Sequence, residues 1–163
     1  MKVNGVLLDT SFFIRFLNDA DPLFRNALEY YKYFLSNDIK MHISTISIAE
    51  YCVGGSISEL PLRNLVILPF NLNHAMKTGE LAKVVFMNKG KLKLLERNII
   101  PNDSKLFSQA DIEKNIIYYL SSDTESTKIY HLLQEEGHKP NFNFIDLKTP
   151  PNEYFGYLDL KIF

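Results

Sequence analysis

The sequence predicts an α/β protein in which helices cover both faces of a central, mainly parallel five-stranded sheet, so that one domain is built from three layers. Short apolar runs alternate along the chain with longer segments whose apolar residues recur at helical spacing, and this βαβα order implies a parallel sheet. The first apolar run is continuous, as expected for a strand buried on both faces of such a sheet. A chain of 163 residues, 46% of them hydrophobic, is long enough for one good core and too short for two ordinary domains.

The first half of the chain supplies three of the predicted strands. The first strand is residues 6–8, which are three apolar residues bounded by Gly5 and Asp9. The second strand is predicted over residues 39–44, and the third, also buried, over residues 65–70. A helix is expected directly after Asp9.

Amphipathic helices connect these strands. One opens at Asp21-Pro22, because Asp is a good cap and Pro is favoured in the first turn. The next covers residues 44–55, and a third covers residues 73–87, with Met76 among the side chains predicted to face the core.

The second half of the chain continues the pattern. A helix is entered at Asn102-Asp103, and residues 116–120 form the clearest strand by β-branched and aromatic content. A helix is then predicted over residues 125–136, and an edge-type strand over residues 143–147.

The domain is therefore expected to span residues 1–147. Residues 148–163 form a C-terminal extension that contains Pro150-Pro151 and several aromatic residues. The sequence leaves open whether this extension packs on the domain or pairs with a partner.

Composition limits the compartment and the partners. No apolar run approaches the length needed to span a bilayer, so a cytoplasmic protein is expected. The single cysteine, Cys52, excludes an internal disulfide framework, and its apolar-looking helix predicts a buried position. Eighteen basic and 19 acidic residues give a net charge of -1, so any nucleic-acid surface must be local.

One local basic segment follows the helix over residues 73–87. It is either an ordinary solvated face or an edge that contacts phosphates. The residues that would contact RNA in the second case are Lys89, Lys91, Lys93 and Arg97.

Four acidic residues occupy positions that can meet at one edge of the sheet. Asp9 and Asp123 each follow an apolar strand, Glu50 lies beside the apolar stripe of its helix, and Asp103 stands at a helix entrance. Each also has an ordinary structural explanation, because Asp9 and Asp103 can cap helices and Glu50 can reach solvent. Right-handed βαβ crossovers would bring all four to the same rim.

A cluster of four carboxylates would need compensation by cations. Oxygen ligands suit hard divalent ions, so Mg²⁺ or Mn²⁺ is the expected cofactor. Such a site can activate water and stabilise charge on a phosphate, which outlines a metal-dependent phosphoryl-transfer centre.

The motifs around these acids resemble the PIN-domain family over residues 3–147. They are Leu-Leu-Asp-Thr-Ser-Phe, Ile-Ala-Glu-Tyr, Asn-Asp-Ser-Lys-Leu-Phe-Ser-Gln-Ala and Tyr-Leu-Ser-Ser-Asp, in that order. The resemblance implies a Mg²⁺- or Mn²⁺-dependent endoribonuclease that acts on single-stranded RNA. It assigns Asp9, Glu50, Asp103 and Asp123 to the acidic quartet that is both catalytic and metal-binding. It also matches Thr10 and Ser122 to catalytic hydroxyls and, more weakly, Asn102.

Many small bacterial members of this family act as VapC-like toxins of toxin-antitoxin pairs. That resemblance leaves a protein antitoxin and a second copy of the chain open as partners. The basic stretch over residues 89–102 and the long C-terminal extension both depart from a minimal toxin.

Three other functions are compatible with parts of the sequence. A non-catalytic PIN-like module that binds RNA or protein is the main alternative, although the complete acidic set favours an enzyme. A haloacid-dehalogenase-like phosphatase would need a second Asp where Ser11 stands. A Cys-His enzyme is disfavoured because the four histidines show no supporting spacing around Cys52.

Overall fold

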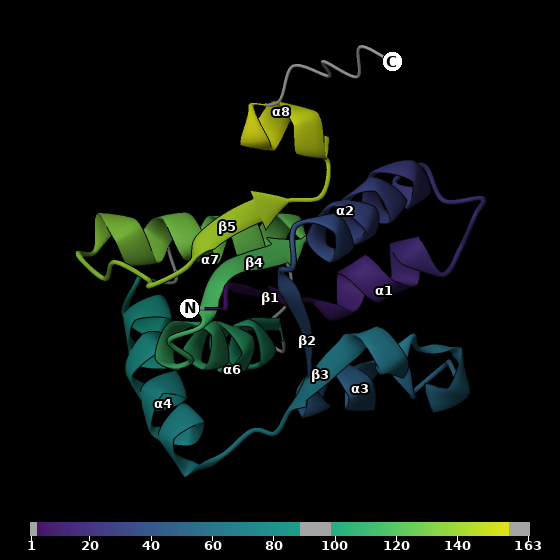
Figure 1. Cartoon of the computed structure of the whole chain (residues 1–163). Helices are drawn as coiled ribbons and strands as arrows, with labels where there is room; N and C mark the ends of the chain where they lie inside the picture. The colour runs from purple at the N-terminus through teal and green to yellow at the C-terminus, as the bar shows by residue number, and fades with distance from the viewer. Residues whose placement is uncertain (1–2, 89–98, 157–163) are drawn as a thin grey trace.

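The chain folds around a five-stranded sheet with the strand order β3-β2-β1-β4-β5 (Figure 1). A computed structural model describes residues 3–88 and 99–156. Every neighbouring pair of strands is parallel, which confirms the predicted α/β fold with a parallel sheet. The strands are β1 (Gly5–Leu8), β2 (Lys40–Ser44), β3 (Leu65–Leu68), β4 (Ile116–Ser121) and β5 (Asn143–Asp146).

Helices follow the strands in the expected alternating order. The α-helices are α1 (Thr10–Phe16), α2 (Phe24–Ser36), α3 (Thr45–Tyr51), α4 (Leu72–Met87), α6 (Ile99–Ile112), α7 (Thr124–Glu135) and α8 (Pro151–Phe155). Two short 3₁₀ turns, η1 (Ile57–Glu59) and η2 (Leu62–Asn64), precede β3. Figure 1 shows α1 and α2 on one side of the sheet, with α4 and α6 on the other.

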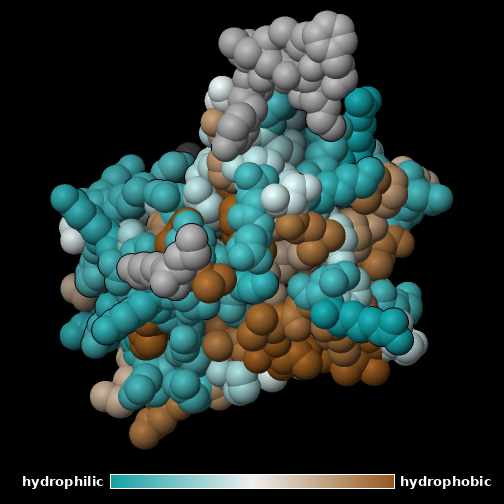
Figure 2. All heavy atoms as spheres, in the orientation of Figure 1, coloured by the Kyte–Doolittle hydropathy of each residue, from teal (hydrophilic) through white to brown (hydrophobic). Residues whose placement is uncertain are grey.

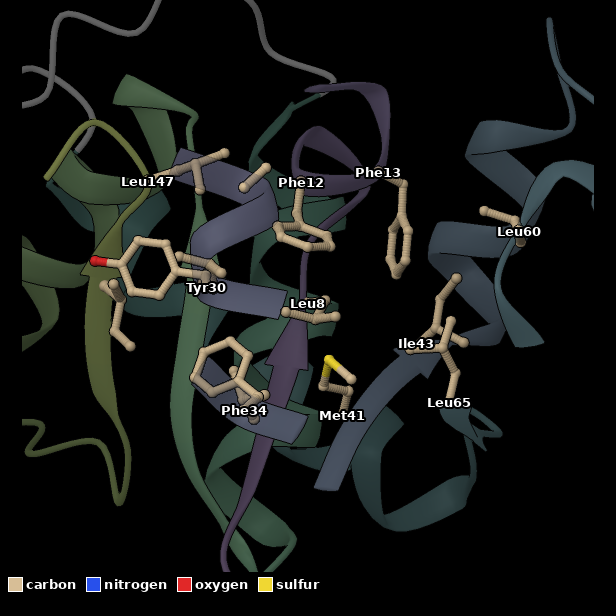
Figure 3. Packing of buried hydrophobic residues seen from close by; sticks show 14 residues of the cluster. Leu8, Phe12, Phe13, Tyr30, Phe34, Met41, Ile43, Leu60, Leu65 and Leu147 are labelled. Atoms are coloured by element: carbon tan, nitrogen blue, oxygen red, sulfur yellow. The ribbon is translucent and has the colours of Figure 1, made fainter. Parts of the chain in front are cut away.

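The two faces of the sheet carry separate hydrophobic cores, because successive strand residues point to opposite faces. Val6 and Leu8 of β1 pack with α1 and α2, whereas Leu7 packs with α4, α6 and α7. Figure 3 shows the first core, in which Phe12, Phe34 and other side chains surround Leu8. Burying each such side chain contributes about 1.5–3 kcal/mol.

The edge strand β3 is more exposed than its sequence predicts. Val66 and Ile67 keep 46% and 45% of their surface accessible, so the expectation of a fully buried strand is wrong. A strand at the edge of the sheet has a neighbour on one side only, and its apolar residues add to the hydrophobic surface near β3 in Figure 2. The predicted inward position of Met76 is also wrong, since this residue of α4 is exposed.

Helix α3 ends earlier than its apolar periodicity predicts. It ends at Tyr51, and the following residues form a turn. Cys52 is consequently exposed, which corrects its predicted burial, and Val53 is 89% exposed. Gly55 lies so close to the Tyr51 ring that an added Cβ would stand 2.5 Å from Cε1, so the chain turns back onto the end of its own helix here.

The described part of the C-terminal extension packs against α2. The Tyr30 hydroxyl donates a hydrogen bond to the Thr149 carbonyl oxygen at 2.7 Å, and Asn26 Nδ2 donates to the Leu147 carbonyl oxygen at 3.0 Å. The ring of Phe155 stacks on Tyr33 with centroids 4.1 Å apart. Helix α8 therefore closes one end of the core around α2.

Among the described helices, none combines the length and the apolar character that a membrane crossing requires.

Candidate functional site

An open pocket of roughly 340 Å³ lies beyond the carboxyl ends of the central strands. Ligand sites of open parallel sheets form at this rim, because the loops that leave the strands surround it. The described residues that line the pocket are Asp9, Thr10, Ser11, Ile14, Glu50, Asn102, Asp103, Leu106 and Asp123. The structure thus brings the four acids of the predicted quartet, with Thr10 and Asn102, to one place.

Asp9 serves both as a helix cap and as a wall of the pocket. Its backbone N–H continues the β1–β4 pairing by donating to the Leu120 carbonyl oxygen at 3.0 Å. Its Oδ2 accepts hydrogen bonds from the Ser11 hydroxyl at 2.6 Å and from the Ser121 hydroxyl at 2.8 Å. Burial raises the pKa of Asp9, and the charge of Asp123 adds to that effect. The two interpretations of Asp9 as a cap and as a site residue are therefore compatible.

Glu50 is held by donors on both of its oxygens. The Thr10 hydroxyl donates to Oε2, and Asn102 Nδ2 donates to Oε1 at 2.6 Å. Burial raises the pKa of Glu50, and the charge of Asp9 acts in the same direction, whereas Lys105 opposes them. Glu50 therefore faces the pocket rather than extending freely into solvent.

Asp103 lies inside α6, so the prediction that this helix opens at Asn102-Asp103 is wrong, and capping does not explain Asp103. It is only 5% exposed. Its Oδ1 accepts a hydrogen bond from the Ser126 hydroxyl at 2.7 Å, but its buried Oδ2 has no partner among the described residues. Burial, followed by the charges of Asp9, Asp123 and Glu50, raises the pKa of Asp103 well above its ordinary value.

Asp123 caps α7, and its Oδ1 accepts a hydrogen bond from the Glu125 N–H at 2.8 Å. Of the two serines before Asp123, it is Ser121 whose hydroxyl contacts Asp9, alongside Ser11, whereas the hydroxyl of Ser122, the residue matched from the motif, forms no hydrogen bond with a described residue. Strand alternation explains this difference: Tyr119 shares a face with Leu7, so Ser121 and Asp9 extend that same face. Counting this alternation in the sequence would have identified Ser121.

The oxygen atoms of the pocket fit a hard divalent cation. None of the described lining residues is basic, and the partnerless Oδ2 of Asp103 is a buried acceptor that a cation would satisfy. Within residues 3–88 and 99–156, no group of three or more His, Cys, Asp or Glu side chains is yet arranged so that it could hold a metal ion. Asp9, Asp103, Asp123 and Glu50 would hold such an ion from around the pocket.

The predicted RNA-contacting residues Lys89, Lys91, Lys93 and Arg97 lie outside the described residues.

The sheet and its acidic rim define an α/β protein whose pocket is built from carboxylates and hydroxyls. No protein-family model matches the chain, and no curated protein matches it. Several solved structures, in contrast, match the chain. A chain in the crystal structure of VapBC2 from Rickettsia felis, bound to a DNA fragment from its promoter, is 21% identical, with a TM-score of 0.58 over 87% of this chain and 98% of that chain. A chain of VapBC-1 from nontypeable Haemophilus influenzae is 13% identical, with a TM-score of 0.56 over 89% of this chain and 99% of that one.

A third neighbour is VapC20 from Mycobacterium tuberculosis, a toxin that cleaves the sarcin-ricin loop. It is 13% identical, with a TM-score of 0.51 over 75% of this chain and 92% of that chain. The chain therefore has the PIN-domain fold of these VapC-type structures, as its motifs predict.

Proposed function

We propose that this protein is a Mg²⁺- or Mn²⁺-dependent endoribonuclease that hydrolyses phosphodiester bonds of single-stranded RNA. The observation that carries the proposal is that Asp9, Glu50, Asp103 and Asp123 line one pocket without a basic residue among its described lining. Four carboxylates in one pocket repel one another unless cations compensate them. The fold that the chain shares with VapC20, a toxin that cleaves the sarcin-ricin loop, supports RNA cleavage as the activity.

In this proposal the chain supplies oxygen ligands and orients them. Asp9 and Asp103 each have one oxygen fixed by a serine hydroxyl, which leaves the other oxygen for the pocket. Thr10 and Asn102 fix Glu50 at the opposite wall. A divalent ion bound there would lower the pKa of water and stabilise negative charge on the phosphate. The carboxylates could also accept the proton of the attacking water.

RNA would approach across the open mouth of the pocket. A cluster of carboxylates repels phosphates, so basic residues must hold the backbone nearby, and Lys89, Lys91, Lys93 and Arg97 are our candidates. Replacing these four with alanine should weaken binding similarly for all sequences and flatten its salt dependence, because phosphate contacts carry little base information. An unchanged salt dependence would exclude them as RNA contacts.

We further propose that the protein is the toxin of a toxin-antitoxin pair. Two of the neighbours quoted above are VapBC complexes, and the first was crystallised on promoter DNA. Co-expression with the product of an adjacent small gene should suppress any cleavage activity and yield a complex on size-exclusion chromatography. Light scattering of the isolated chain would decide whether it also forms a homodimer.

The decisive experiment is RNA cleavage with added Mn²⁺, comparing the wild type with Asp9→Asn. Asparagine keeps the size and the capping oxygen of Asp9 but removes its charge. If Asp9 holds a cation, turnover should fall by orders of magnitude while the fold survives. Attack by external water should leave a 5′-phosphate and a 3′-hydroxyl. Normal cleavage by the variant, cleavage in EDTA, or cyclic phosphate products would contradict the proposal.

A matched control removes an aspartate that caps a turn without lining the pocket. Asp21 accepts a hydrogen bond from the Leu23 N–H at 2.8 Å and pairs with Arg15 at 2.7 Å. Asp21→Asn should therefore leave Mn²⁺-dependent cleavage unchanged. If the wild type itself gains no thermal stability from millimolar Mn²⁺, the non-catalytic binding module becomes the better description.

A further inference from the structure

Tyr119 of β4 is a fully buried tyrosine whose ring packing requires no hydroxyl. Its side chain has no accessible surface, and it lies beside Leu7 in the register of β1 and β4. Its ring meets Phe107 edge-on with centroids 4.9 Å apart, and it packs at 5.7 Å against both Phe142 and Phe144. Phenylalanine would fill the same space among these aromatic rings.

The hydroxyl of Tyr119 lies close to the acidic pocket. It forms no hydrogen bond of acceptable geometry with a described residue, and a buried hydroxyl without a partner costs free energy. Burial raises the pKa of Tyr119 well above its ordinary value, and the charges of Asp9 and Asp103 and a polar contact with Asp9 add to that rise. The phenol therefore remains a neutral donor near the carboxylates of Asp9 and Asp103.

Asp9 has an oxygen that is available to receive this donor. Its Oδ2 is already bound by the hydroxyls of Ser11 and Ser121, whereas its Oδ1 accepts no hydrogen bond from the described residues. The Tyr119 phenol and Asp9 both extend the face of the sheet that Leu7 begins.

We propose that Tyr119 is a positioning residue of the acidic site, whose hydroxyl donates a hydrogen bond to Asp9 once the cluster is ionised around a cation. This inference rests on the proposed function. A hydrogen bond from Tyr119 would fix the orientation of the Asp9 carboxylate, and partners of this kind typically change metal affinity or activity by about 10–100-fold when they are removed. Tyr119 would not touch the RNA or the reacting phosphate.

The test compares Tyr119→Phe with Tyr130→Phe. Tyr130 is a matched control, because its ring packs at 5.6 Å against the same Phe142 but its hydroxyl donates to the Phe142 carbonyl oxygen at 3.1 Å, among residues that do not line the acidic pocket. Tyr119→Phe should melt in EDTA at or above the temperature of the wild type, since it loses only a partnerless hydroxyl. Its Mn²⁺ midpoint for thermal stabilisation should rise about 10-fold, with a matching loss of turnover.

Tyr130→Phe should show the opposite pattern. It loses a satisfied hydrogen bond, so its melting temperature should fall while its Mn²⁺ midpoint stays at the value of the wild type. A second readout uses protein with ¹³C-labelled tyrosine rings, in which the Tyr119 signal should move on addition of Mg²⁺ and the Tyr130 signal should not.

The outcomes separate this inference from the proposed function. A wild type that responds to Mn²⁺, together with a Tyr119→Phe variant that responds at the same concentration, overturns the role of Tyr119 alone. A wild type without any Mn²⁺ response overturns both.

Discussion

The side-chain amide of Asn102 donates a hydrogen bond to Oε1 of Glu50 at 2.6 Å, across 52 residues of sequence. Thr10 donates to the other oxygen of the same carboxylate. Glu50 sits near the end of the short helix α3, so these two donors, from α6 and α1, fix where its carboxylate points. The glutamate of the proposed site therefore depends on three separate helices.

Asn102→Asp should impair cleavage, because it replaces a donor to Glu50 with a second negative charge of the same size. Like charges disfavour ionisation, so the pKa of Glu50 should rise further and the acidic limb of the pH-rate profile should move to higher pH. We expect turnover at neutral pH to fall about 10–100-fold. Asn64→Asp is the control, since Asn64 donates to the Tyr31 hydroxyl at 2.7 Å and does not line the pocket. Equal activity in both variants would contradict the role of Asn102.

Asp103→Asn should stabilise the metal-free protein at neutral pH. The pKa of Asp103 is raised above its ordinary value of 3.8, so the folded state favours the protonated form. Its contribution to stability is therefore present at acidic pH and is lost as pH rises through the raised pKa. The melting temperature of the variant in EDTA should exceed that of the wild type by a few degrees at pH 7, since ~1 kcal/mol corresponds to about 2–4 °C at this size.

This advantage of Asp103→Asn should shrink as pH falls through the raised pKa of Asp103, because the wild-type carboxylate then gains its proton. Mn²⁺ should reverse the order at pH 7, because only the ionised wild type offers a full set of oxygen ligands. An advantage that does not change with pH would show that Asp103 is not the titrating group.

Ser121→Ala should damage the site more than Ser122→Ala. The buried Ser121 hydroxyl donates to Asp9 and accepts from the Asp123 N–H at 3.0 Å, whereas the Ser122 hydroxyl forms no hydrogen bond with the described residues. Removing Ser121 Oγ leaves a backbone donor without its partner, which costs about 1–3 kcal/mol. Chemical denaturation and Mn²⁺-dependent cleavage should both separate the two variants. A larger effect at Ser122 would favour the assignment made from the sequence motif.

Tyr30→Phe should destabilise the protein by about 0.5–1.5 kcal/mol without changing cleavage, because it removes only the hydrogen bond to the Thr149 carbonyl oxygen. Truncation after Leu147 should cost more, since it also removes the stacking of Phe155 on Tyr33. Urea denaturation of the two proteins would measure both effects. An undiminished stability after truncation would place the boundary of the folded unit at Leu147.

The sequence predicts the strands, their parallel pairing and the residues of the acidic rim because these follow from local patterns and the handedness of the crossovers. Local patterns do not determine the order of the strands in the sheet. The apolar sequence of β3 therefore predicts a buried strand, whether the strand lies at the centre or at the edge. The end of α3 was missed for a related reason. Val53 continues the helical spacing, yet Gly54 and Gly55 weaken the helix and the chain turns at Tyr51. The hydroxyl of Tyr119 also escapes sequence reasoning, because only the folded register brings it beside Asp9.

The early end of α3 has a practical consequence. It leaves Cys52, the one thiol in the chain, exposed two residues beyond Glu50. A maleimide dye can therefore be attached at a single native position, two residues from the pocket-lining Glu50, without an engineered cysteine. Fluorescence anisotropy of the labelled protein would follow RNA or a partner arriving at this rim in real time, and Cys52→Ser provides the unlabelled blank.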